Sequence, residues 1–189
     1  MTTKRDLYTP LADGNLRLEP LAETHREGLR AASAADTEIW EIFPYSMLAA
    51  HFDPAFAAML HGSRQVYAIF DGETLVGCTS WYAHDPANRA VAIGGTYIAP
   101  STRGGPFNLR MKRLMITHAR ACGIVRIVFD VDARNKRSQA AVLKLGARLE
   151  GVLRQNRITW TGHVRDTCVF SLLPGEESEL LRGEIPARW

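Results

Sequence analysis

The stretch TRGGPFNLRMKRLM, residues 102–115, places two glycines and a proline directly before a run with helical spacing. The apolar residues of that run recur at three- and four-residue intervals, which predicts a helix over 107–121. The first amides of a helix have no intrahelical acceptor, and the helix dipole adds roughly half a positive charge there. Gly104 and Gly105 have no Cβ to hold an anion away, and Arg103 adds a permanent charge. The stretch therefore predicts a phosphate-binding turn, with a tight loop that binds nothing as the alternative.

Strands precede the bend and follow the helix. The run RAVAIGGTYIA, residues 89–99, is a strand interrupted by Gly94-Gly95. Glycines in a strand indicate a bulge or a close approach of another group to the backbone. The dense apolar run IVRIVFDV, residues 124–131, is typical of a buried strand. A strand, a helix and a second strand in this order predict a parallel crossover.

The rest of the chain adds strands and helices around this unit. Periodicity and turn residues predict a strand at 15–21, helices at 21–34, 53–62 and 135–146, and two hairpins that turn at Asp71-Gly72 and Thr161-Gly162. We expect one mixed α/β domain over residues 1–175, followed by a polar tail over 176–189.

Length and composition indicate an ordinary globular protein. At 189 residues the chain can bury a core without disulfides. Its three cysteines, Cys78, Cys122 and Cys168, lie far apart in apolar runs, which indicates reduced thiols in a reducing compartment. No apolar leader and no run of about 18 apolar residues is present. We therefore expect a soluble, cytoplasmic protein with no membrane partner.

Basic residues are concentrated in the middle of the chain. Residues 103–157 contain thirteen Lys and Arg and three acids, a balance of +10, whereas the remainder holds ten basic and seventeen acidic residues, a balance of −7. This asymmetry favours a polyanionic partner, although a solvated helix face explains it equally well. Nucleic-acid readers usually interleave aromatic residues, and here only Phe107 and Phe129 lie in the segment, so a phosphorylated cofactor ranks ahead of nucleic acid. The Walker and dinucleotide-binding patterns are both absent.

Three stretches resemble the sequence of a known family. YIAPSTRGGPFN is similar to a strand end and pyrophosphate loop, NKRSQAAVLKLGARLEG to a second acetyl-CoA motif, and RDTCVFSL to a last strand. Together, residues 92–173 resemble the core of a GNAT-superfamily N-acetyltransferase of the ribosomal-protein-alanine (Rim-type) branch. Pro106 and Asn108 depart from the usual small residues of the loop, and the pair Asn108 and Lys112 resembles a sub-branch of the family.

The resemblance implies a fold, a cosubstrate and a reaction. The expected fold class is α/β (α+β): a single GNAT-like domain whose central mixed, mostly antiparallel twisted sheet contains a parallel splayed strand pair and carries helices on both faces. The expected reaction moves an acetyl group from acetyl-CoA to a primary amine, either a protein or peptide N-terminal α-amine or a small-molecule amine, without a metal. The implied cofactor-binding residues are Ile98, Arg103, Gly104, Gly105, Phe107, Asn108, Asn135 and Ser138.

The resemblance also suggests catalytic residues, Ser138 and Glu150. Ser138 stands where Rim-type enzymes have a hydroxyl near the sulfur, and a serine that bonds the first turn of its helix is the alternative. Relatives often carry a glutamate base where this chain has Ala92, and Glu150 could instead act through water or serve only as a surface carboxylate. A backbone amide near Tyr97 or Ile98 would stabilise the oxyanion. Acceptor specificity is expected from aromatic residues: Trp40, Phe43, Tyr45, Trp81, Tyr82 and Trp160.

The missing glutamate bears on the acceptor and on the function itself. Deprotonating an α-amine of pKa about 8 at neutral pH costs roughly 1.4 kcal/mol, whereas a lysine side chain costs roughly 4.6 kcal/mol. A site without a strong base therefore favours α-amines. Ala92 also leaves open a non-catalytic acyl-CoA binding or regulatory module, and a homodimer remains an option.

Overall fold

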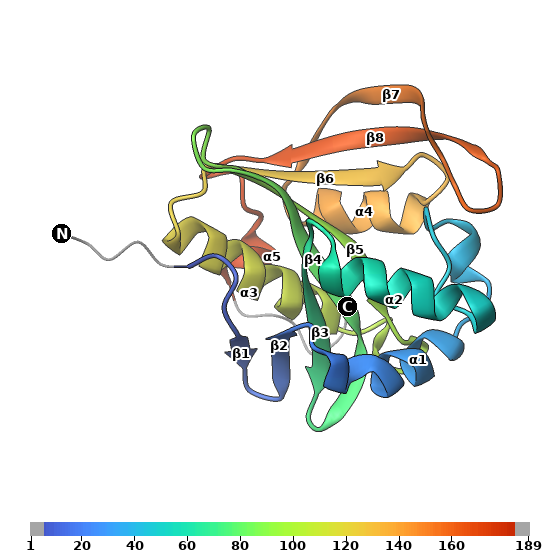
Figure 1. The fold of residues 1–189 in the computed structure, drawn as a ribbon. Coiled ribbons are helices and arrows are strands. Elements are labelled where there is room, and N and C mark those ends of the chain that lie inside the picture. Colours follow the sequence, from blue (N-terminus) through green and yellow to red (C-terminus); the bar gives the residue numbers. More distant parts are fainter. Residues whose placement is uncertain (1–5, 184–189) are drawn as a thin grey trace.

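The computed structural model describes residues 6–183 (Figure 1). Its strands are β1 (Leu11–Asp13), β2 (Leu16–Pro20), β3 (Gln65–Asp71), β4 (Thr74–Asp85), β5 (Ala90–Ile98), β6 (Arg126–Asp132), β7 (Arg148–Ile158) and β8 (Val164–Leu172). Its α-helices are α1 (Arg26–Ala34), α2 (Phe52–His61), α3 (Phe107–Ala121), α4 (Lys136–Lys144) and α5 (Glu179–Arg182). The predicted strands and helices are confirmed to within a few residues. β1, which has one buried residue and no periodic pattern, and α5, which lies in the predicted tail, were not predicted.

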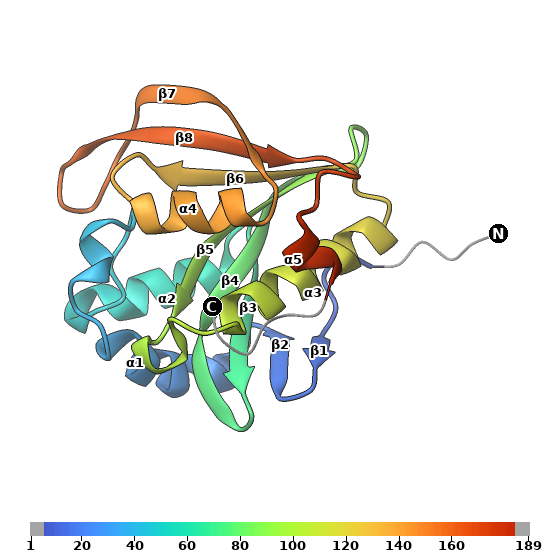
Figure 2. The ribbon, with the colours of Figure 1, turned by 180° about the vertical axis from the view of Figure 1, so that it is seen from behind.

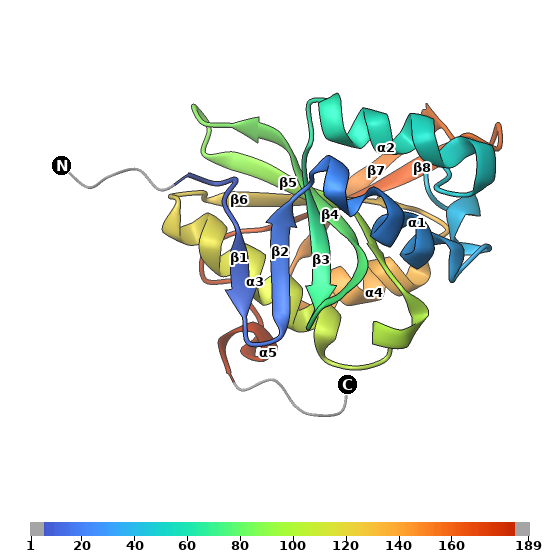
Figure 3. The same ribbon diagram turned by 60° about the horizontal axis from the view of Figure 1, so that its bottom comes forward.

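Within residues 6–183 the strands form one sheet in the order β1-β2-β3-β4-β5-β6-β8-β7. Every neighbouring pair is antiparallel except β5 and β6, which are parallel. Figure 3 shows β1, β2 and β3 side by side. The predicted mixed, mostly antiparallel sheet with a single parallel pair is confirmed.

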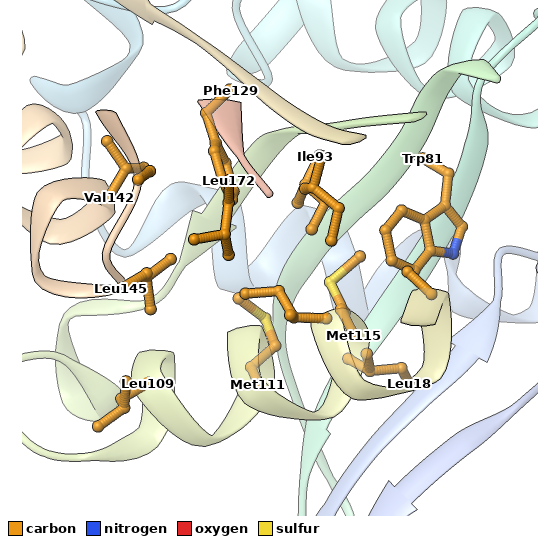
Figure 4. Close-up of a cluster of buried hydrophobic side chains, with 14 of the residues drawn as sticks. Leu18, Trp81, Ile93, Leu109, Met111, Met115, Phe129, Val142, Leu145 and Leu172 are labelled. Carbon is orange, nitrogen blue, oxygen red and sulfur yellow. The ribbon is translucent and has the colours of Figure 1, made fainter. Parts of the chain in front are cut away.

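Helices cover both faces of the sheet. Helices α1 and α2 lie on one face, and α3, α4 and α5 lie on the other, as the views from the front and from behind show (Figures 1 and 2). Two apolar clusters match these layers. Leu29, Phe52 and Phe56 belong to the first. The second joins Met111 and Met115 of α3 to sheet residues such as Ile93, Phe129 and Leu172 (Figure 4).

Strands β5 and β6 pair over a short distance and then separate. Only Ala90–Ala92 of β5 pair with β6, although β5 continues to Ile98. On the other edge of β5, the register with β4 shifts between Gly94 and Tyr97, and Gly95 has φ +60°. A Cβ on Gly94 would lie 2.7 Å from the ring of Tyr82, so the site requires glycine. The predicted bulge and splayed pair are confirmed.

The end of the described chain packs onto α3. Leu181 of α5 is buried in the cluster that contains α3, and Arg120 Nε lies 2.9 Å from Glu177 Oε1. Residues 176–183 of the predicted tail are therefore in contact with the domain, and residues 184–189 lie outside the described part. No helix of residues 6–183 is long and apolar enough to cross a membrane.

Candidate active site

A cavity of about 440 Å³ opens where β5 and β6 separate. It is lined by β5, the bend before α3, the end of β6, the start of α4 and residues 39–45. The structure brings together seven of the eight predicted cofactor-binding residues on its wall: Ile98, Arg103, Gly104, Gly105, Asn108, Asn135 and Ser138. The eighth, Phe107, does not line the cavity, because its side chain is buried in the apolar cluster beneath α3.

The bend before α3 presents bare backbone to this cavity. Gly104 has φ +78°, which favours glycine, and a Cβ on Gly104 or Gly105 would meet no atom within 4 Å. No side chain caps α3, and its first turn holds no acidic residue. Within the described chain no backbone carbonyl accepts the amides of Gly104 and Gly105. These amides and the helix dipole therefore make the bend suitable for an anion.

The Arg103 side chain points away from the bend. Its Nε donates to the carbonyl oxygen of Ile98 at 2.7 Å, and its Nη1 forms an ion pair with Asp36. The guanidinium also lies 5.5 Å from the centre of the Tyr97 ring. Arg103 thus ties the end of β5 to the segment after α1, and its charge is compensated by Asp36. The backbone, rather than this side chain, is therefore available to an anion at the bend.

Lys112, one turn into α3, is the least expected residue of the cavity wall. It is only 7% exposed, and its Nζ donates to Thr96 Oγ1 at 2.7 Å. Thr96 Oγ1 in turn lies 2.8 Å from Thr79 Oγ1. An ammonium can donate three hydrogen bonds, and among the described residues one acceptor and no carboxylate reaches it. Burial therefore lowers the pKa of Lys112 from 10.5 to about 7.

Asn135 and Ser138 lie together at the start of α4. Asn135 Oδ1 accepts a hydrogen bond from the Ser138 amide at 2.9 Å, so Asn135 caps the helix as its sequence position predicts. Both residues also line the cavity. The cap fixes the first turn of α4 beside the split between β5 and β6. A role of the Ser138 hydroxyl in proton transfer stays a prediction.

Glu150 is not brought to the site. It does not line the cavity, and Arg126 Nη1 and Ser171 Oγ both donate to its Oε1 at 2.7 Å. The Arg126 guanidinium above all, with the Ser171 hydroxyl, lowers the pKa of Glu150 to about 2. A carboxylate this acidic is a weak base. The suggestion that Glu150 takes the proton is therefore replaced by its structural alternative, an ion pair between strands.

Asp130 is the carboxylate that the sequence analysis missed. It lines the cavity, and Tyr82 donates its hydroxyl to Asp130 Oδ2 at 3.0 Å across the bulged strand. Burial, and the neighbouring Asp130 charge, raise the pKa of Tyr82. Asp132 also lines the cavity, but its Oδ2 lies 2.8 Å from Arg134 Nη2. The sequence did contain a signal for both acids. Asp130 lies in the apolar run 124–131 and Asp132 directly follows it, so the two stand at alternate positions and lie on one face of β6.

The aromatic residues expected to contact the acceptor divide into two groups. Phe43, Tyr45 and Tyr82 line the cavity, whereas Trp40 and Trp81 are fully buried in the two cores. Trp160 does not line the cavity; its Nε1 donates to the Trp40 carbonyl oxygen at 2.7 Å. The hairpin of β7 and β8 is thereby fastened over the segment that follows α1.

No group of three or more His, Cys, Asp or Glu side chains within residues 6–183 is arranged to hold a metal ion. The geometry offers an anion-binding bend, a cavity between separating strands, and a second end lined by aromatic and charged side chains. Such a cavity can hold an extended, phosphate-bearing ligand with its far end beside Gly94 and Asp130.

Comparisons with known proteins agree with this geometry. The family model described as acetyltransferase (GNAT) domain matches residues 15–148. A structure described as an acetyltransferase from T. thermophilus is 34% identical, with a TM-score of 0.77 over 88% of this chain and 90% of that one. A GCN5-related N-acetyltransferase from Brucella melitensis is 26% identical, with a TM-score of 0.80 over 92% and 81%. RimJ of Mycobacterium smegmatis, in complex with CoA-disulfide, is 22% identical, with a TM-score of 0.69 over 89% and 87%. No match was found among curated protein sequences.

Proposed function

The chain belongs to the GNAT acetyltransferase family, and we propose that it transfers the acetyl group of acetyl-CoA to the α-amine of a peptide, a protein or a small molecule. The observation that carries the proposal is the uncapped start of α3, whose bare amides open into the cavity where β5 and β6 separate. A diphosphate suits the bend, and an extended chain suits the gap between the strands.

The residues of the wall have distinct roles in holding acetyl-CoA. The amides of Gly104, Gly105 and the first turn of α3 bind the diphosphate, so Phe107 contributes through its backbone while its side chain anchors the helix. The edge of β5 that β6 leaves unpaired offers backbone groups near Ile98 to the pantetheine arm. Asn135 holds the opposite wall through its cap on α4.

Transfer to an amine needs a proton acceptor and a stabilised oxyanion. A backbone amide after the bulge, near Tyr97, serves the oxyanion. Ala92 is buried and pairs within the sheet, so it offers no base. Among the described residues of the wall the only carboxylates are Asp130 and Asp132, and Asp132 is held by Arg134. Asp130 therefore takes the amine proton through water, and the Ser138 hydroxyl donates a hydrogen bond to the departing thiolate and relays a proton to it from solvent.

A comparison of two amines tests the proposal. The difference of roughly 3.2 kcal/mol between deprotonating an α-amine and a lysine side chain corresponds to about 200-fold in rate. Release of free thiol from acetyl-CoA is measured with a peptide that has a free α-amine and with its N-acetylated counterpart that retains a lysine. Preference for the α-amine by about two orders of magnitude is expected, and equal rates on both would contradict the choice of acceptor.

The alternative is a non-catalytic acyl-CoA binding module, which the alanine at position 92 favours. The same assay separates the two. Tight binding of coenzyme A in calorimetry, without thiol release on any amine, would establish the binding module. Steady thiol release establishes the enzyme.

A further inference from the structure

Two arginines face each other at the side of the cavity. Arg157 of β7 and Arg165 of β8 are directly opposite in the register of the two strands, and both line the cavity. Like charges directly opposite on an antiparallel pair are destabilising. Arg157 is exposed, and its side chain has no hydrogen bond or ion pair within residues 6–183. The pair therefore creates a positive site that its own strands do not neutralise.

Arg165 is buried without adequate partners. Only 5% of it is exposed, and its Nε makes no hydrogen bond with any residue of the described chain. The nearest carboxylate oxygen, Asp132 Oδ2, is 3.8 Å away, and Nη2 reaches the Asp130 carbonyl oxygen only at 3.5 Å. Asp132 is already bound by the amide, Nε and Nη2 of Arg134 at 2.8–3.0 Å. A guanidinium has five N–H donors, and among residues 6–183 only Nη2 of Arg165 has a hydrogen-bond acceptor.

A third arginine borders the same space. The Arg64 guanidinium lies 4.1 Å above the ring of Tyr82, and its Nη1 donates to Ser80 Oγ at 3.2 Å. No carboxylate within the described chain forms an ion pair with it. Tyr82 in turn donates to Asp130, whose carbonyl oxygen faces Arg165. Contacts through Tyr82 and Asp130 thus connect Arg64 with Arg165, and Arg157 lies opposite Arg165 on the neighbouring strand.

The charge of the whole wall agrees with this distribution. Seven lining residues are Lys or Arg and two are Asp, a formal balance of +5 when Lys112 is counted as charged. The phosphates of coenzyme A bind at the start of α3, where backbone amides supply the contacts. Arg64 lies instead against Tyr82, one of the cavity-lining aromatic residues expected to contact the acceptor, so the arginines are available to a second anion. Paired guanidinium groups match the geometry of a carboxylate or a phosphate.

We propose that the acceptor carries an acidic oxygen group, a carboxylate or a phosphate, near its amine, and that Arg64, Arg157 and Arg165 bind this group. The inference rests on the proposed transfer to an amine and specifies its substrate class. In this arrangement the amine of the acceptor lies near the Asp130 carboxylate, and the acidic group of the acceptor lies near the arginines. The two ends of one acceptor thus meet opposite charges.

Matched acceptors test the inference. One pair is the C-terminally amidated dipeptides Ala-Asp and Ala-Asn, which share an α-amine and differ in one carboxylate. The second pair is the C-terminally amidated dipeptides Ala-phosphoserine and Ala-Ser, which share an α-amine and differ in one phosphate. We expect kcat/KM to be at least tenfold higher for the acid in one pair, and the pair that shows it distinguishes carboxylate from phosphate. In Arg157→Gln the ratio of acid to neutral acceptor should fall at least fivefold. Arg154→Gln, at an exposed position of β7 outside the cavity wall, is the matched control and should keep the ratio.

Other results would overturn the inference. Ratios near one in the unmodified protein, or an unchanged ratio in Arg157→Gln, would remove the arginine site. An increase of the KM for acetyl-CoA in Arg157→Gln as large as that for the acidic acceptor would assign the arginines to coenzyme A. If no amine releases thiol, the proposed function fails separately, and calorimetry with the same acceptors decides: acid-selective binding lost in Arg157→Gln supports the site, and equal binding of acid and neutral acceptor refutes it.

Discussion

Replacing Lys112 by methionine should stabilise the protein, and by an amount that depends on pH. In the folded protein burial lowers the pKa of Lys112 from 10.5 to about 7. One pKa unit corresponds to about 1.36 kcal/mol, so below pH 7 the buried ammonium costs about 5 kcal/mol relative to an uncharged side chain. The hydrogen bond to Thr96 returns about 1 kcal/mol. Lys112→Met should therefore be more stable by up to about 4 kcal/mol at pH 6, since its unbranched side chain fits the same space.

The pH dependence distinguishes this cause from simple repacking. Between pH 7 and 10.5 the unfolded chain binds one more proton at Lys112 than the folded chain does, so the free energy of unfolding rises with pH. The advantage of Lys112→Met should be constant below about pH 7 and should shrink by about 1.4 kcal/mol per pH unit above it. At pH 9.5 the two proteins should be nearly equal in stability.

Urea unfolding of both proteins at pH 6, 7, 8 and 9.5 measures this difference. The same exchange at Lys136, an exposed position of α4, controls for effects of the substitution itself. If Lys112→Met and the unmodified protein differed by the same amount at all four pH values, Lys112 would keep its proton up to pH 9.5 in the folded protein, and the lowered pKa would be refuted.

Three further outcomes are expected. Gly105→Glu places a carboxylate at the start of α3, which competes with the diphosphate; calorimetry should show at least tenfold weaker binding of coenzyme A, while the melting temperature hardly changes. Glu150→Gln should leave kcat/KM unchanged and should lower the free energy of unfolding by less than about 1 kcal/mol, because the ion pair with Arg126 is partly exposed. That loss should be present above pH 4.5 and should vanish as the pH falls through about 2, where the folded carboxyl takes up its proton. Asn135→Ala should cost about 1 kcal/mol in thermal or urea unfolding by removing the cap on Ser138, and Asn135→Ser, which keeps a capping oxygen, should recover most of it.

Local patterns were sufficient to predict the separate parts of the site. The bounds of α3 follow from periodicity and from the glycine bend, the bulge of β5 follows from Gly94-Gly95, and the cap of α4 follows from Asn135. These features depend on neighbours in the sequence or on backbone sterics. The splayed strands, and the meeting of the three parts at one cavity, were implied only by the family resemblance.

The chemistry of individual side chains was harder to predict, because it depends on residues far away in the sequence. Glu150 resembled a free acid until its partner Arg126, 24 residues earlier, was known. Lys112 belongs to a basic helix, and only the packing of α3 on the sheet shows that it is buried. Nothing in the sequence distinguishes Arg165 from any other arginine in a strand. Its Nε lacks a hydrogen-bond partner because Asp132, its nearest carboxylate, is already bound by Arg134. Burial and ion pairing are tertiary properties that periodicity does not encode.

The excess of basic residues in the middle of the chain has a different meaning once the ion pairs are known. Within residues 6–183, ion pairs are formed by six of the thirteen cations of residues 103–157: Arg103, Arg110, Arg120, Arg126, Arg134 and Arg148. Four of their acidic partners come from outside the segment: Asp36, Asp13, Glu177 and Glu176. Much of the asymmetry along the chain is therefore cancelled within the fold. From this segment, Lys112, Arg137 and Arg157 line the cavity and take no part in these ion pairs. Arg64, from before the segment, and Arg165, from after it, join them on the wall, and the carboxylate nearest to Arg165 is shared with Arg134. A partner that binds through the basic charge of the surface would need the arginines that are ion-paired within the fold. A ligand inside the cavity needs only the few cations of its wall. The distribution thus favours two small anions at two ends of one cavity over an extended polyanion on the surface.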